Sequence, residues 1–138
     1  MKALFGRALG DAIPKYLVCG RRPLLFGHDR FTSEGRVPET IIAIEGKLNV
    51  LELESAGLKD ICALGGNHVS DELAVALRDV GVKHLHVVFD GDAGGDEGID
   101  ALLRLPHVDG IMVTGCVAPK GNPTAKDILV ERAAAFGA

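Results

Sequence analysis

An alternation of short apolar runs with segments of helical spacing constrains the fold more than any other feature of the chain. The apolar runs are continuous and rich in β-branched residues, as in strands buried on both faces of a sheet. The predicted strands are 40–45, 60–66, 84–90 and 110–115. The predicted helices are 49–57, 70–81, 96–105 and 124–136. Strands that alternate with helices form βαβ units, so the sequence predicts an α/β fold with about four parallel strands flanked by helices.

Local signals mark the ends of these helices. Ser70 suits an N-cap, because its side chain can accept a hydrogen bond from the first turn. Gly57 and Gly81 suit helix stops, because glycine tolerates the left-handed backbone that commonly follows a last turn. Pro106 ends the third helical segment.

The first 36 residues differ from the rest of the chain in composition and charge. They are rich in Gly, Pro and Arg and hold seven basic residues against three acidic ones, although the whole chain carries a net charge of −4. We expect 1–36 to form a basic β hairpin or extended arm, and 37–138 to form the α/β domain. The charge asymmetry is equally compatible with chance surface composition.

Composition excludes several classes of protein. The chain has no Trp and only 4% aromatic residues, which argues against a platform that stacks bases. Its three cysteines form no CxxC pair, so neither a zinc ribbon nor a disulfide framework is indicated. The first residues lack a signal peptide, and no apolar run is long enough to cross a membrane. We therefore expect a cytoplasmic protein without a membrane partner.

Three carboxylates follow two of the predicted strands. Glu45 ends the first strand, Asp90 ends the third, and Asp92 comes two residues later. Functional groups gather at the carboxyl ends of parallel strands, where these acids would repel one another. A Mg²⁺ ion, which prefers oxygen ligands, removes that penalty. The alternative is that Asp-Gly-Asp is a simple turn with backbone hydrogen bonds, and that the glutamate is solvated.

Two further motifs admit a structural explanation. Asp127 is a candidate fourth acid, but Thr124 to Asp127 also has the pattern of a helix capping box. His84 and His86 are two residues apart on a strand, so they point to the same face. A zinc site would need further ligands, and a packed or solvated pair is favoured. Cys62, inside an apolar run, is expected in the core.

Taken together, "IIAIEGKLNVLELESAGLKDICALGG" and "VVFDGDAGG" resemble the Toprim domain. The motifs of that family are a Glu-Gly after one strand and an Asp-x-Asp after a later one, which Glu45, Asp90 and Asp92 match. The stretch "GRALGDAIPKYLVCG" is similar to the segment that precedes Toprim in bacterial replicative primases. The end "PKGNPTAKDIL" is similar to their acidic loop, with Asp127 at its last acid.

The resemblance implies a Rossmann-like Toprim fold and primase-type nucleotidyl transfer. Primer synthesis would need single-stranded DNA template, nucleotide triphosphates and Mg²⁺, for which Mn²⁺ can substitute. Glu45, Asp90 and Asp92 would be catalytic, and the same three residues with Asp127 would hold the metal. The implied nucleic-acid contacts are Arg7, Lys15, Arg21, Arg22 and Lys47. A replicative helicase would be a partner through domains that are not in this chain.

Departures from the primase pattern keep two other functions open. Lys47 and Asn49 stand where primases typically carry a Tyr and an Asp after the Glu-Gly. Asp96 and Glu97 lie where a basic residue usually follows Asp-x-Asp, and Ala125 lies near the first acid of the acidic loop. The alternatives are a small Toprim nuclease that cleaves phosphodiester bonds, and a non-catalytic nucleic-acid-binding or assembly module.

Overall fold

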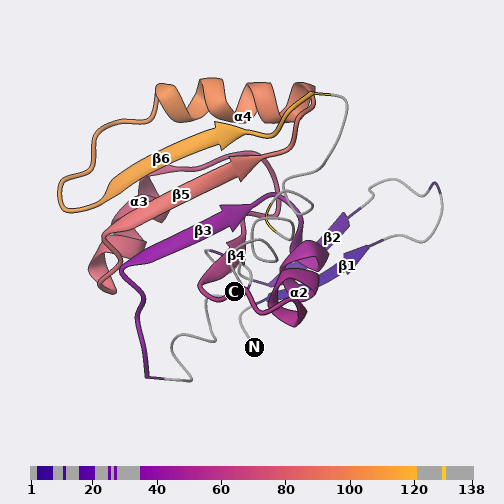
Figure 1. The fold of residues 1–138 in the computed structure, drawn as a ribbon, viewed down its shortest axis with the longest axis horizontal. Coiled ribbons are helices and arrows are strands. Elements are labelled where there is room, and N and C mark those ends of the chain that lie inside the picture. Colours follow the sequence, from indigo (N-terminus) through magenta and orange to yellow (C-terminus); the bar gives the residue numbers. More distant parts are fainter. Residues whose placement is uncertain are drawn as a thin grey trace.

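The computed structural model describes residues 3–7, 11, 16–20, 25, 27, 35–120 and 129. Four of its strands are β3 (Thr40–Ile44), β4 (Ile61–Ala63), β5 (His84–Phe89) and β6 (Met112–Val117). They form one parallel sheet in the spatial order β4-β3-β5-β6 (Figure 1). The predicted parallel α/β arrangement is therefore confirmed, and each strand lies within or overlaps a predicted apolar run.

Three described helices connect these strands: α2 (Lys47–Ser55), α3 (Asp71–Asp79) and α4 (Ala93–Leu103). Helix α3 begins where the sequence predicts, because the Leu73 amide donates a hydrogen bond of 3.1 Å to Ser70 Oγ. Helices α2 and α3 each end two residues before a glycine at positive φ. These glycines are Gly57 at 94° and Gly81 at 107°, so both predicted stops are confirmed.

Helix α4 begins three residues earlier than predicted, at Ala93 instead of Asp96. Asp92 is its N-cap, and the Gly95 amide donates a hydrogen bond of 2.8 Å to Asp92 Oδ1. The first turn contains two glycines, which are poor helix formers and carry no side chain that shows helical periodicity. The cap and the surrounding packing, rather than local propensity, therefore determine where this helix starts.

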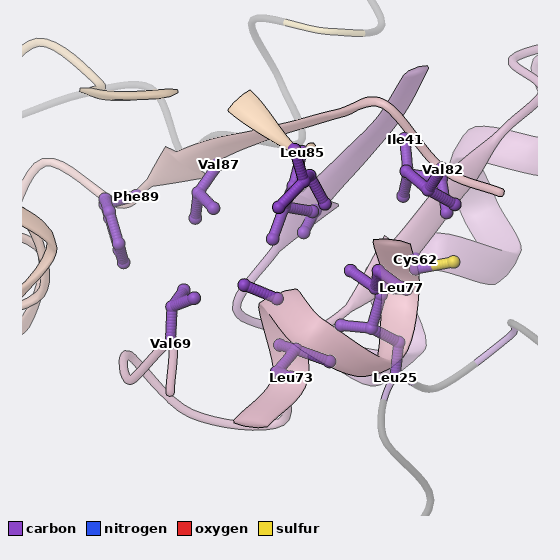
Figure 2. Packing of buried hydrophobic residues seen from close by; sticks show 13 residues of the cluster. Leu25, Ile41, Cys62, Val69, Leu73, Leu77, Val82, Leu85, Val87 and Phe89 are labelled. Atoms are coloured by element: carbon purple, nitrogen blue, oxygen red, sulfur yellow. The ribbon is translucent and has the colours of Figure 1, made fainter. Parts of the chain in front are cut away.

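The side chains of β5 divide between two hydrophobic clusters, one on each face of the sheet. Leu85, Val87 and Phe89 belong to the larger cluster, with α3 and α4 on their side (Figure 2). Val88 points to the other face and joins a smaller cluster that includes Leu53 of α2. The C-terminal half of β5 is continuously apolar because both of its faces are covered.

The larger cluster also contains residues from outside the α/β alternation. Leu25, from the predicted arm, is 1% exposed and lies near Leu77 of α3 (Figure 2). Cys62 is fully buried in the same cluster, as expected. The N-terminal segment therefore contributes to the core, while the division into an arm at 1–36 and a domain at 37–138 stays a prediction.

A separate two-stranded sheet lies in the N-terminal segment. Strands β1 (Ala3–Arg7) and β2 (Tyr16–Gly20) pair antiparallel, as in the first of the two predicted forms, a β hairpin or an extended arm (Figure 1). The predicted helix 124–136 lies outside the described residues except for Leu129, which is helical and buried. Among the described helices, none has the length and apolar character needed to span a membrane.

Candidate active site

The structure brings Glu45 and Asp90 together at the carboxyl edge of the sheet. Strands β3 and β5 are neighbours with Ile44 opposite Val88, so the residues that follow the two strands leave the sheet at the same edge. The negative charge of Asp90 and hydrogen bonds with it act directly on the Glu45 carboxyl. Two acids that are 45 residues apart in the chain are thus adjacent in space because parallel strands end in register.

The environment of Glu45 disfavours an unaccompanied negative charge. The pKa of its carboxyl is raised from 4.5 to about 7, mainly by burial, then by the charge of Asp90 and to a smaller extent by that of Asp92. A hydrogen bond with the Asp90 backbone lowers the pKa but offsets only part of the rise. Glu45 Oε1 is buried and has no hydrogen-bond partner among the described residues. A buried oxygen without a hydrogen-bond partner is stabilised when it binds a proton or a cation.

Asp92 lies at the same edge, but one of its oxygens is already used. Its Oδ1 accepts the hydrogen bond from the Gly95 amide that caps α4. The side chain is otherwise exposed, and its charge still acts on Glu45. Asp92 therefore combines a structural role, which the turn interpretation of Asp-Gly-Asp anticipated in part, with a position next to the other two acids.

Close backbone packing around the acids explains two of the nearby glycines. A Cβ at Gly95 would lie 1.7 Å from the carbonyl oxygen of Asp90, and one at Gly91 would lie 2.3 Å from the carbonyl oxygen of Pro119. Neither position has room for a side chain. Glycine here allows one stretch of backbone to pack on another, and this packing fixes the loop that carries Asp90 and Asp92.

Lys47 lies next to the loop that follows β4. It is the first residue of α2, two residues after Glu45, and its Cε lies 2.7 Å from where a Cβ of Gly65 would be. The Gly65 amide in turn donates a hydrogen bond of 3.1 Å to the Glu45 carbonyl. The lysine side chain thus packs across the loop after β4.

Two contacts at this edge were not found from the sequence. Asn67 Nδ2 donates a hydrogen bond of 2.8 Å to the Gly94 carbonyl, which ties the loop after β4 to the first turn of α4. Lys120, just after β6, forms an ion pair with Asp96 in the same turn. Both contacts join residues at least 24 positions apart, and no local sequence signal indicates either one.

The remaining predicted site residues are only partly placed. Asp127, Lys15, Arg21 and Arg22 lie outside the described residues, and of Arg7 only the backbone, on β1, is described. Within the described part of the chain, no three His, Cys, Asp or Glu side chains are already arranged as a set of metal ligands. The complete ligand set implied by the Toprim resemblance thus remains a prediction.

Relatives of the chain share one description. Over 98 residues it is 32% identical to a DNA primase of Staphylococcus aureus, which covers 67% of this chain and 16% of the relative. Over 121 residues it is 31% identical to a DNA primase of Legionella pneumophila, which covers 81% of this chain and 21% of that relative. The chain is a homologue of bacterial DNA primases. It spans about a sixth to a fifth of the length of these primases.

Solved primase structures agree with this assignment. A DNA primase domain from Pseudomonas aeruginosa matches 98% of the chain with a TM-score of 0.77 and 30% identity, and 44% of that domain is covered. A DnaG primase catalytic domain bound to single-stranded DNA matches 98% of the chain with a TM-score of 0.71 and 23% identity, and supports the fold. No model of a known protein family matches the chain. The primase likeness is consistent with the Toprim motifs in the sequence.

Proposed function

We propose that this primase homologue carries the metal-binding part of a nucleotidyltransferase that synthesises primers on single-stranded DNA. The observation that carries the proposal is the pairing of Glu45 with Asp90, in which a buried Glu45 oxygen lacks a hydrogen-bond partner among the described residues. Homology to DNA primases supplies the reaction class. The chain spans about a sixth to a fifth of the length of those primases, so the proposal for this chain is limited to the metal-binding part.

The donor atoms at this edge fit Mg²⁺. They are carboxylate oxygens, which hard divalent cations prefer, and the orphaned Glu45 oxygen is a position that a cation would satisfy. Asp90, the second oxygen of Asp92 and, from the resemblance, Asp127 would complete the set, with Mn²⁺ as a substitute ion. When bound, the ion neutralises negative charge on the phosphoryl group that is transferred.

The chain's own groups have distinct roles in this proposal. Glu45 would either accept the proton of the attacking 3′-hydroxyl as a general base or act as a ligand of the ion. Lys47, the first residue of α2 and two residues after Glu45, would hold a phosphate of the incoming nucleotide triphosphate. The helix cap at Asp92 and the contact between Asn67 and Gly94 would keep the acidic loop in place.

The basic residues of the N-terminal segment would guide the template. Arg7, Lys15, Arg21 and Arg22 form the proposed phosphate contacts, which position a strand without reading its sequence. A solved primase catalytic domain is described as bound to single-stranded DNA, which supports that type of partner here. The helicase contact, through other domains, and a cytoplasmic location both stay predictions.

Two assays on the whole chain test this proposal. The first measures Mn²⁺ binding by electron paramagnetic resonance, and the second follows an end-labelled primer annealed to single-stranded DNA with nucleotide triphosphates and Mg²⁺. Asp90→Asn should weaken Mn²⁺ binding by about tenfold or more. The matched control is Asp100→Asn, an exposed acid farther along α4, which should bind like the wild type.

The outcomes separate the possible functions. Longer products that disappear in Asp90→Asn establish nucleotidyl transfer. Shorter products that disappear in the same variant would replace it with phosphodiester cleavage. If Asp90→Asn and Asp100→Asn both match the wild type in the two assays, the carboxylates at this edge are not the site.

A further inference from the structure

The two histidines that the sequence placed on one face of a strand belong to a larger polar group. His86 lies opposite Thr114 on the neighbouring strand, and Cys116 lies two residues beyond Thr114. The side chains of His84, His86, Thr114 and Cys116 are joined by a continuous chain of contacts. None of these four residues belongs to the proposed carboxylate site, and the proposed nucleotidyl transfer makes no use of them.

Thr114 fixes the orientation of both imidazole rings. Its Oγ1 lies 2.6 Å from His84 Nε2 and 2.6 Å from His86 Nδ1. A hydroxyl has one hydrogen to donate, so with neutral rings it donates to one nitrogen and accepts from the other. When Thr114 donates to His84, His86 carries its proton on Nδ1 and donates it to Thr114. The lone pair of His86 Nε2 then points away from Thr114.

That lone pair is directed toward a thiol. Cys116 Sγ lies 3.7 Å from His86 Nε2, and the cysteine side chain is exposed. In tetrahedral zinc sites, the Zn–S and Zn–N distances place a sulfur and a nitrogen ligand about 3.6 Å apart. The two atoms are therefore already separated by nearly the distance that one zinc ion would impose on them.

The second nitrogen of His86 completes the resemblance to a zinc ligand. Histidines that bind metals almost always donate their other ring N–H to an acceptor, which holds the ring in place. Thr114 is in position to be that acceptor, and His84 holds Thr114 from the opposite side. In this arrangement His84 is a positioning residue and not a ligand.

We propose that Cys116 Sγ and His86 Nε2 form a binding site for Zn²⁺ or a cation of similar softness, with water in the remaining coordination positions. Thiolate and imidazole favour Zn²⁺, whereas the carboxylate edge suits Mg²⁺. Only two side chains of this part of the structure supply ligands, in keeping with the absence of a three-ligand group among the described residues. The site is therefore open to solvent.

The test uses the whole chain, reduced and in excess Mg²⁺, titrated with Co²⁺ as a spectroscopic probe and with Zn²⁺ by calorimetry. We expect a sulfur-to-cobalt charge-transfer band in the wild type. Cys116→Ser and His86→Gln should each abolish the band and weaken Zn²⁺ binding at least tenfold. Thr114→Val should weaken binding about tenfold while keeping the band. The control His107→Gln changes an exposed histidine and should bind like the wild type.

The results decide the proposal without reference to nucleotidyl transfer. Circular dichroism melts of each variant establish whether it is folded. If His86→Gln is unfolded, the test of the zinc site rests on Cys116→Ser, which changes an exposed side chain. Absence of the band in the wild type would overturn the proposal. So would a band or a Zn²⁺ affinity that survives Cys116→Ser unchanged.

Discussion

Replacing Glu45 by glutamine should make the metal-free protein more stable at alkaline pH. The folded protein holds the proton on Glu45 up to about pH 7, whereas the unfolded chain releases it near 4.5. Between these values the folded state binds more protons, so the free energy of unfolding falls as the pH rises from about 4.5 to 7 and is constant above. Glutamine carries no charge at any of these pH values, so the free energy of unfolding of the variant does not fall in this way.

The size of the effect follows from the two pKa values. A rise from 4.5 to about 7 corresponds to about 3 kcal/mol if the group were fully shielded from solvent. Glu45 is only half-buried, and screening by water reduces the effect to on the order of 1–2 kcal/mol at pH 8. For a chain of this size, that gain raises the thermal midpoint by roughly 3–8 °C.

Thermal melts of the wild type and Glu45→Gln at pH 4 and pH 8, without divalent cations, provide the measurement. We expect equal midpoints at pH 4, where both side chains are neutral, and a higher midpoint for the variant at pH 8. The control is Glu97→Gln, an exposed glutamate on α4. Equal midpoints for wild type and Glu45→Gln at pH 8 would refute the reasoning that burial and the charge of Asp90 destabilise the ionised form of Glu45.

Other substitutions test single features of the fold and the site. Asp92→Asn should keep the α4 cap, so we expect it to lose Mn²⁺ affinity while its stability stays near that of the wild type. Asp92→Ala should lose Mn²⁺ affinity and also lower the free energy of unfolding in urea by about 1 kcal/mol. Similar stability of the two variants would contradict the capping role. Ser70→Ala should destabilise the chain by about 1 kcal/mol through the lost cap of α3, measured the same way. Gly95→Ala should lower the thermal midpoint strongly, because the new Cβ would overlap the Asp90 carbonyl. The control Gly66→Ala should leave the midpoint unchanged, because a Cβ there has no atom within 4 Å. Equal midpoints for the two variants would show that the loop adjusts to the added methyl group.

Much of the fold could be predicted because its signals are local. Apolar runs, the Ser70 cap and the glycines at 57 and 81 depend on residues within a turn of one another. The start of α4 could not be predicted in this way. Its first turn reads as a glycine loop, and it becomes helical only when Asp92 caps it and the Asn67 side chain, 27 residues away from Gly94, binds its carbonyl.

The same distinction applies to the functional residues. The sequence alone determined that Glu45, Asp90 and Asp92 follow parallel strands, and therefore that they share one edge of the sheet. Only the tertiary structure decided that the charge of Asp90 raises the pKa of a half-buried Glu45, and that one oxygen of Asp92 accepts the hydrogen bond that caps α4. It alone also set His86 beside Cys116, since strand register joins residues 30 positions apart and no local pattern encodes that register.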